Sequence, residues 1–186
     1  GGYMSVSNAI KSTFSNAFKE LIKTTPVDKI TLKQLCNYCD LGRQTFYNHF
    51  KDKFDLINWV YSSETANIFR DYKNDYDWEK VICKIFYHFL ENKKFYQQVA
   101  KIRSQNSFSE FLVEHTREYY INAIRTRFAK EIIDCELLYT IDFNNYGAVN
   151  MSLKWIHNGM VEKPEAMAAL MMENMPAKLK KYMTTL

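Results

Sequence analysis

The sequence has few residues that interrupt helices. Among its 186 residues there are only five glycines and three prolines. Glycine and proline are the strongest punctuators of local structure, so their scarcity favours long helices over a many-stranded sheet. Glycine occurs only at positions 1, 2, 42, 147 and 159. That distribution excludes a Walker loop, a dinucleotide fingerprint and a nucleophile elbow, each of which needs closely spaced glycines.

Long apolar runs are also missing. No stretch approaches the ~18 apolar residues that a membrane-spanning helix needs. The N-terminal residues lack the basic segment and apolar run of a signal peptide, so we expect a cytoplasmic protein without membrane contact. The four histidines are scattered, and no H-E-x-x-H motif occurs. We therefore expect no metal, no cofactor and no enzymatic activity.

Cysteine is sparse, but two of the four cysteines, Cys36 and Cys39, form a C-x-x-C motif. Such a pair is compatible with zinc or redox chemistry. No second pair lies nearby, and the redox motif requires a preceding strand. Here both residues fall within or at the end of a short predicted helix. We interpret them as small structural residues that remain reduced in the cytosol.

Positive charge is concentrated near the N-terminus. Residues 1–60 hold eight Lys/Arg against five Asp/Glu, a net +3 out of +4 for the whole chain. This asymmetry gives mild support to a nucleic-acid surface in that part, although a solvated face produces the same count.

Residues 31–56, TLKQLCNYCDLGRQTFYNHFKDKFDL, contain two short helix signals separated by a break. Thr31 and Gln34 have the spacing of a capping box, which predicts a helix start. Asp40-Leu41-Gly42 ends that helix, because Asp and Gly tolerate the left-handed backbone of a tight turn. The second helix, predicted at 43–50, buries Phe46 and Phe50 at i, i+4.

The remaining side chains of this second helix are unusually rich in hydrogen-bonding groups. Two helices joined by a three-to-four-residue turn, with the second helix carrying such groups, are typical of a DNA-reading helix-turn-helix. The groups are those of Arg43, Gln44, Thr45, Tyr47, Asn48 and His49.

One segment of the chain runs Thr45-Phe46-Tyr47-Asn48-His49-Phe50 and is followed by Lys53 and Leu56. This segment resembles the signature of the tetracycline-repressor (TetR) family of bacterial transcription regulators. That signature runs threonine, apolar, tyrosine, any residue, histidine and phenylalanine, with a lysine three residues further on. Two positions depart from it. Asp40 and Gly42 stand where members usually have Gly and Ser, and Gly42 removes the usual hydroxyl cap of the recognition helix.

The helix-turn-helix geometry assigns roles to these residues. Arg43 is expected to bind guanine and Gln44 adenine in the major groove, with Asn48 also reading bases. Thr45 would contact a thymine methyl group or a phosphate. The resemblance implies that Tyr47 and His49 contact phosphate or sugar. Lys53 is expected to meet a phosphate at the start of the next helix, and Thr31 and Lys33 to do so from the preceding helix.

The whole chain is predicted to be all-α. A three-helix helix-turn-helix domain at 5–58 is joined by a connecting helix, capped by Asp52, to a helical ligand-binding and dimerisation domain at 59–186. Its later helices are expected at about 108–132, at 135–158 before Gly159, and from Pro164 until Pro176. The first helix is expected from Ser7 or Asn8 to about Lys23.

The expected partners are double-stranded operator DNA, a second copy of the chain, and a small-molecule effector whose binding residues are unknown. DNA half-sites favour a homodimer, which we place in the last two helices, about 135–158 and 164–183. Gly147 and Ala148 would permit close approach. Met167, Met171 and Met175 are spaced for an interface or a core, and His88, His115 and Trp155 are weak ligand candidates.

Residues 146–168 are similar to a TetR branch that includes regulators of dihydroxyacetone-kinase operons. The matching positions run from Tyr146-Gly147 through Trp155 and Asn158-Gly159-Met160 to Pro164. Two hypotheses follow. The first is a homodimeric repressor that a small-molecule effector releases from its operator. The alternative is a co-activator of the same fold that acts with a partner protein.

Overall fold

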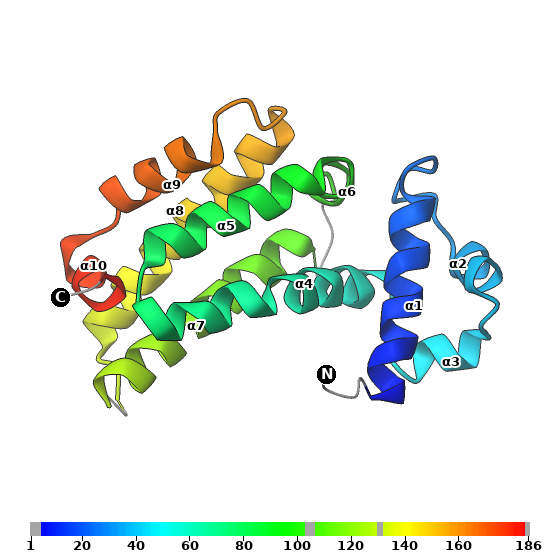
Figure 1. Ribbon diagram of the computed structural model, residues 1–186, viewed down its shortest axis with the longest axis horizontal. Helices are drawn as coiled ribbons and strands as arrows, with labels where there is room; N and C mark the ends of the chain where they lie inside the picture. The colour runs from blue at the N-terminus through cyan, green and yellow to red at the C-terminus, as the bar shows by residue number, and fades with distance from the viewer. Residues whose placement is uncertain (1–4, 103–106, 130–131, 185–186) are drawn as a thin grey trace. The chain divides into compact units, whose positions relative to one another are not determined.

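The computed structural model describes residues 5–102, 107–129 and 132–184. Within these ranges it contains ten α-helices and no strands (Figure 1), which confirms the all-α prediction. No helix among the described residues is long and apolar enough to cross a membrane.

The helices follow one another with short connections. They are α1 (Val6–Leu21), α2 (Leu32–Cys39), α3 (Arg43–Tyr47), α4 (Lys53–Asp75), α5 (Trp78–Glu91), α6 (Lys93–Val99), α7 (Phe108–Phe128), α8 (Cys135–His157), α9 (Pro164–Glu173) and α10 (Ala177–Met183).

The chain forms two compact units. The first unit is Gly1–Glu64 together with Lys94–Phe108, and the second is Thr65–Lys93 together with Ser109–Leu186. The 5–58 segment expected to bind DNA lies within the first unit, which additionally takes in most of α6. The helix α4, expected as the connecting helix, contributes its first half to one unit and its second half to the other.

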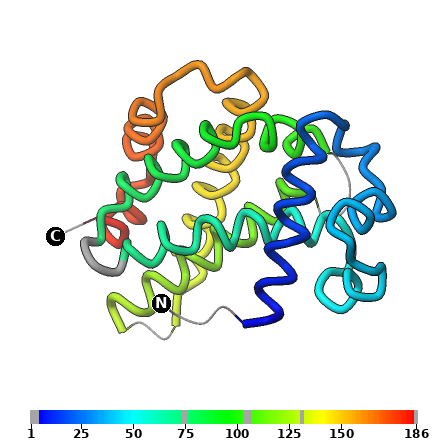
Figure 2. The backbone as a smooth tube through the Cα atoms, turned by 45° about the vertical axis from the view of Figure 1, so that its right-hand side comes forward, coloured from blue at the N-terminus to red at the C-terminus, as the bar shows by residue number. Residues whose placement is uncertain are grey.

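Aromatic packing forms the core of the first unit, in which α1 packs on α2 (Figures 1 and 2). The Phe14 ring meets Phe46 edge-on at 5.2 Å and Phe50 at 6.4 Å. Edge-to-face pairs of this kind add ~0.5–1.5 kcal/mol beyond the burial of their area. Phe46 and Phe50, whose burial the sequence predicts, are at most 2% exposed. Five further core residues are at most 3% exposed: Phe14, Phe18, Ile22, Ile30 and Leu35.

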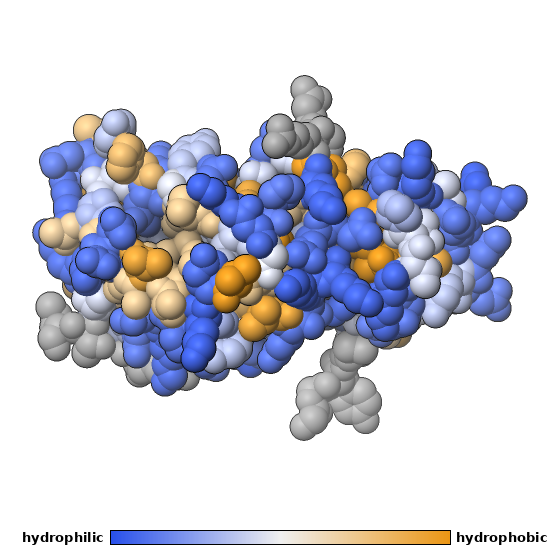
Figure 3. All heavy atoms as spheres, turned by 90° about the horizontal axis from the view of Figure 1, so that it is seen from above, coloured by the Kyte–Doolittle hydropathy of each residue, from blue (hydrophilic) through white to orange (hydrophobic). Residues whose placement is uncertain are grey.

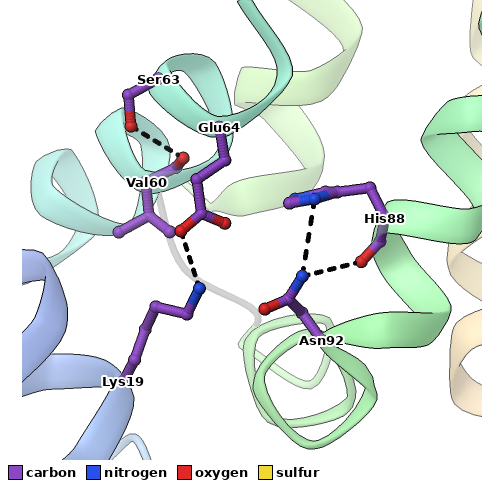
Figure 4. Close-up of polar contacts among 6 residues, drawn as sticks. All are labelled: Lys19, Val60, Ser63, Glu64, His88 and Asn92. Atoms are coloured by element: carbon purple, nitrogen blue, oxygen red, sulfur yellow. Dashed lines mark hydrogen bonds and ion pairs between the residues drawn. The ribbon is translucent and has the colours of Figure 1, made fainter. Parts of the chain in front are cut away.

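Two further segments of the first unit pack on α1. The Lys19 ammonium binds the Glu64 carboxylate of α4 at 2.7 Å (Figure 4). From α6, the Phe95 ring contacts Phe18 edge-on at 6.2 Å. The ion pair is only partly buried, so solvent screening keeps its contribution to stability small.

The second unit is built on an aromatic and polar network around Trp78. The Trp78 ring stacks on Tyr119 at 5.3 Å, and its Nε1 donates to the Tyr120 hydroxyl at 3.2 Å. Asn144 Nδ2 of α8 donates to the same hydroxyl at 3.3 Å. At the end of α5, Asn92 Nδ2 donates to the His88 carbonyl at 3.0 Å (Figure 4), which satisfies one of the last carbonyls of that helix.

Several helix ends differ from the sequence prediction. The recognition helix α3 ends at Tyr47 rather than at residue 50, because Asn48 already serves as its C-cap. The helix α7 ends at Phe128 rather than at 132, and Ala129 has φ +47°. The helix α8 ends at His157, just before the predicted stop at Gly159 (φ +96°), whereas α9 ends at Glu173, ahead of the predicted stop at Pro176.

The C-terminal methionines belong to the core. Met167 is 7% exposed and Met175 is 5% exposed, and the neighbouring Met172 is also buried. Of the two roles that their spacing allowed, the structure of the second unit therefore gives them core packing. Met171 is half-buried, and Met151 is 53% exposed on α8.

Candidate DNA-reading surface

The turn between α2 and α3 has the predicted left-handed geometry. Asp40 has φ +52° and ψ +40°, and its N–H donates to the Cys36 carbonyl. Leu41 N donates to the same carbonyl at 3.1 Å. Gly42 then caps α3 through its backbone alone, with φ −72°, and offers no side-chain acceptor to the first turn of the helix. The loss of the hydroxyl cap, inferred from Gly42 in the sequence, is confirmed.

The short helix α3 presents its polar side chains outward. Arg43, Gln44 and Asn48 are exposed, and Thr45 is half-buried. Gln44 Nε2 donates to Asn48 Oδ1 at 3.1 Å, so these two amides orient each other. Phe46 fixes the opposite face of the helix in the core at 1% exposure. A single buried aromatic residue thus anchors a helix whose other side faces solvent.

Tyr47 and His49 lie at the C-terminal end of this surface. The Tyr47 side chain is 58% exposed, while its ring rests edge-on against Phe46 at 5.7 Å. His49 Nδ1 lies 3.3 Å from the Ser7 hydroxyl of α1. Ser7 and the exposed Lys51, four residues after the end of α3, were not predicted from the sequence.

Thr31 and Lys33 stand at the start of α2. The Thr31 hydroxyl accepts from Gln34 N at 3.2 Å, and Gln34 Oε1 accepts from Thr31 N at 2.8 Å, so the capping box is complete. The Thr31 hydroxyl is therefore committed to its own helix. Lys33 is exposed, and it offers a cation to solvent beside that cap.

The Lys53 side chain has a different environment from the one expected for a phosphate contact. Its ammonium donates to three backbone carbonyls in the loop that precedes α2. They are those of Val27 at 3.0 Å, Asp28 at 3.2 Å and Ile30 at 3.3 Å. The predicted cap of α4 is confirmed, because Asp52 Oδ1 accepts from Phe54 N at 2.8 Å and Asp55 N at 2.9 Å.

A hollow of about 280 Å³ lies between α1, α2, α3 and the start of α4. Phe18, Leu35 and Phe46 form part of its apolar lining. Thr31, Tyr47 and Lys51 line it as well. The hollow therefore lies beside the side chains of Thr31, Tyr47 and Lys51.

The two cysteines of the C-x-x-C motif form no disulfide. Cys36 and Cys39 are free thiols, and Cys39 Sγ donates to the Leu35 carbonyl at 3.2 Å. Burial raises the pKa of both thiols, which makes them poor nucleophiles. No group of three His, Cys, Asp or Glu side chains suited to a metal ion occurs within the described ranges.

The weak ligand candidates of the second unit are engaged in its packing. Trp155 Nε1 donates to the Glu162 carbonyl at 3.1 Å. His115 stacks on Phe111 at 5.2 Å, and burial lowers its pKa. His88 Nδ1 lies 3.5 Å from Asn92 Nδ2. These contacts do not identify an effector site.

The fold and this geometry are those of a helix-turn-helix regulator, with a short second helix that is anchored inside and polar outside. The C-terminal region of TetR-type transcriptional regulators matches residues 76–176. The chain belongs to the TetR family of transcriptional regulators, not to a family of enzymes.

The chain is similar to an HTH-type dhaKLM operon transcriptional activator, DhaS, of Lactococcus lactis subsp. lactis (strain IL1403). The two are 26% identical over 110 residues, which cover 59% of this chain and 58% of that protein. The match thus spans little more than half of the relative's length.

Two solved structures share the fold. The dihydroxyacetone kinase operon activator DhaS has a TM-score of 0.66 at 20% identity, with 94% of this chain and 98% of that chain covered. A TetR transcriptional regulator from Streptococcus agalactiae 2603V has a TM-score of 0.62 at 18% identity, with 89% and 92% covered.

Proposed function

We propose that the protein binds double-stranded operator DNA through α3, as a homodimer, and thereby regulates transcription. The observation that carries the proposal is the one-sided anchoring of α3. Phe46 is buried, while Arg43, Gln44 and Asn48 are exposed together on a helix that follows a left-handed turn. An exposed arginine and two amides match the donor and acceptor patterns of guanine and adenine.

The proposed DNA contacts fall into two groups. Arg43, Gln44 and Asn48 read bases, whereas Thr45, Tyr47, His49 and Lys33 dock on the sugar-phosphate backbone. Thr31 supports docking as the cap of α2, and Lys51 adds a cation beside Tyr47. Lys53 is left out of both groups, because its ammonium binds three backbone carbonyls.

A binding selection from random duplex DNA tests the proposal. The wild-type chain should enrich a repeated half-site. Arg43→Ala should relax the preference at one base position and cost ~1–3 kcal/mol. Arg70→Ala is the matched control, since Arg70 is an exposed arginine of the second unit and should leave the selected sequence unchanged. Failure of the wild type to enrich any sequence would refute the proposal.

The proposed dimer interface is the outer face of α8, together with α9. Figure 3 shows that exposed apolar residues form separate patches within a mainly hydrophilic surface on one face of the molecule. Three large side chains of α8 are exposed to solvent: Tyr139 by 71%, Phe143 by 70% and Tyr146 by 58%. The rings of Tyr139 and Phe143 stack on each other at 6.4 Å. Leu170 of α9 is 51% exposed.

These side chains recur at i, i+4 and i+7, which is the spacing of one helix face. A Cβ added at Gly147 would meet nothing within 4 Å, so a second backbone can approach there. Phe143→Arg should convert a dimer into a monomer in sedimentation velocity at micromolar concentration. The matched control is Arg70→Ala, which should stay dimeric. A monomeric wild type would refute this interface.

The direction of regulation has two candidates. Release of a repressor by a small-molecule effector is the hypothesis that the sequence analysis favoured. The names of the DhaS relatives favour an activator instead. A reporter placed behind the selected operator separates the two, because deletion of the regulator raises expression under a repressor and lowers it under an activator.

A further inference from the structure

The loop between α1 and α2 decides where α2 begins. Lys29 N and Ile30 N both donate to the Pro26 carbonyl, at 2.9 and 3.2 Å, and form a compact turn. Val27 and Ile30 are 4% and 3% exposed, so this turn is anchored in the core. Thr31, the N-cap of α2, follows immediately. Any shift of the turn therefore moves the cap and the helix behind it.

Two side chains from distant parts of the first unit hold this turn. From α4, the Lys53 ammonium binds the carbonyls of Val27, Asp28 and Ile30. From α6, Gln98 Oε1 accepts from Val27 N at 3.3 Å. The Val27 residue thus has its N–H bound by one helix and its carbonyl by another. We call Lys53 and Gln98 the loop clamp.

The loop clamp engages the full donor capacity of Lys53. An ammonium group has three N–H donors, and the structure provides one carbonyl for each. A phosphate that approached the Lys53 ammonium would have to displace these carbonyls, whose groups would then lose a charge-assisted hydrogen bond. Lys33 differs, since its ammonium lies in solvent at the start of the same helix.

We propose that Lys53 and Gln98 are positioning residues for DNA binding. They fix the α1–α2 turn, and through it α2 and the recognition helix, without contacting DNA themselves. This inference rests on the proposed function as a DNA-binding protein. It also gives α6, which lies directly after α5 in the chain, a role in setting the geometry of the DNA-reading unit.

Salt dependence separates positioning from phosphate contact. Each neutralised phosphate contributes about 0.9 to the slope of log affinity against log salt. Lys53→Met should lower affinity for the selected operator about tenfold or more, with the slope unchanged. Lys33→Met, the matched control, should lower the slope by about 0.9. A slope lowered by about 0.9 in Lys53→Met would overturn the proposal.

Amide exchange tests the Gln98 half of the clamp directly. In Gln98→Met the Val27 amide should exchange about tenfold faster or more, because it loses its acceptor, and operator affinity should fall at an unchanged slope. Gln98→Glu keeps an oxygen acceptor and should restore both. Unchanged Val27 exchange in Gln98→Met and Lys53→Met would refute the clamp. If wild type binds no DNA, the proposed function fails, while Val27 exchange still decides the clamp.

Discussion

The N-cap of the recognition helix offers no side-chain acceptor, so substitution at this position should change the stability of the protein. Gly42 is the N-cap of α3, with φ −72° and ψ 155°, a conformation open to any residue. A Cβ added there would meet only Thr45 Oγ1 at 3.9 Å, an ordinary contact. Gly42→Ser therefore fits without strain and supplies a hydroxyl acceptor for the first turn of α3.

Two contributions set the magnitude of the Gly42→Ser effect. A serine cap is better than a glycine cap by a few tenths of a kcal/mol. Loss of glycine's freedom in the unfolded chain adds ~0.4–1 kcal/mol. The free energy of unfolding should therefore rise by about 1 kcal/mol, which corresponds to roughly 2–4 °C in Tm for a chain of this length. Urea denaturation followed by circular dichroism measures it.

Gly42→Ala separates the two contributions. It has the same reduced freedom in the unfolded state, but alanine is a poor N-cap, so its stability should fall ~1 kcal/mol below that of Gly42→Ser. Amide hydrogen exchange over residues 42–50 should likewise be slower in Gly42→Ser than in Gly42→Ala. Equal stability of the serine and alanine variants would refute the inference that α3 lacks a useful cap.

Three further predictions concern the second unit. Tyr120→Phe removes the acceptor for Trp78 Nε1 and Asn144 Nδ2, so urea denaturation should show a loss of ~1–3 kcal/mol, and an unchanged midpoint would contradict the network. Burial lowers the pKa of His115 in the folded state. The contribution of His115 to the free energy of unfolding is therefore present above about pH 6.5 and is lost as the pH falls below that value. His115→Phe should accordingly reduce the loss of stability between pH 7 and 5, and equal pH profiles would contradict this. Gly159→Ala places a side chain at φ +96°, so the free energy of unfolding should fall by ~1 kcal/mol or more. An unchanged thermal unfolding midpoint would show that the substitution causes no strain.

Helix starts were predictable because capping is local. Thr31 and Asp52 each cap the helix that the sequence assigned to them, through hydrogen bonds that span three residues. Helix ends were less predictable. The α3 prediction ran three residues too far, because Phe46 and Phe50 are both buried although the chain leaves the helix after Tyr47.

The surface of α8 shows a second limit of sequence patterns. Leu138 and Leu153 are apolar residues of the same helix, and the structure leaves both half-buried. The exposed face instead carries Tyr139, Phe143 and Tyr146. A sequence pattern identifies helix faces by spacing, whereas the choice of the face that is covered depends on which neighbouring helices pack there.

The helical class, the helix-turn-helix and the set of polar side chains on α3 could all be predicted from the order of the residues. Each of these depends on residues within one or two helical turns, where spacing and capping are read directly. Only the tertiary structure decided the environment of Lys53, since its carbonyl partners lie 23–26 residues earlier in the chain. It likewise brought Gln98 to Val27 across 71 residues. Contacts at such separations are set by the packing of whole helices, which leaves no periodic trace in the sequence.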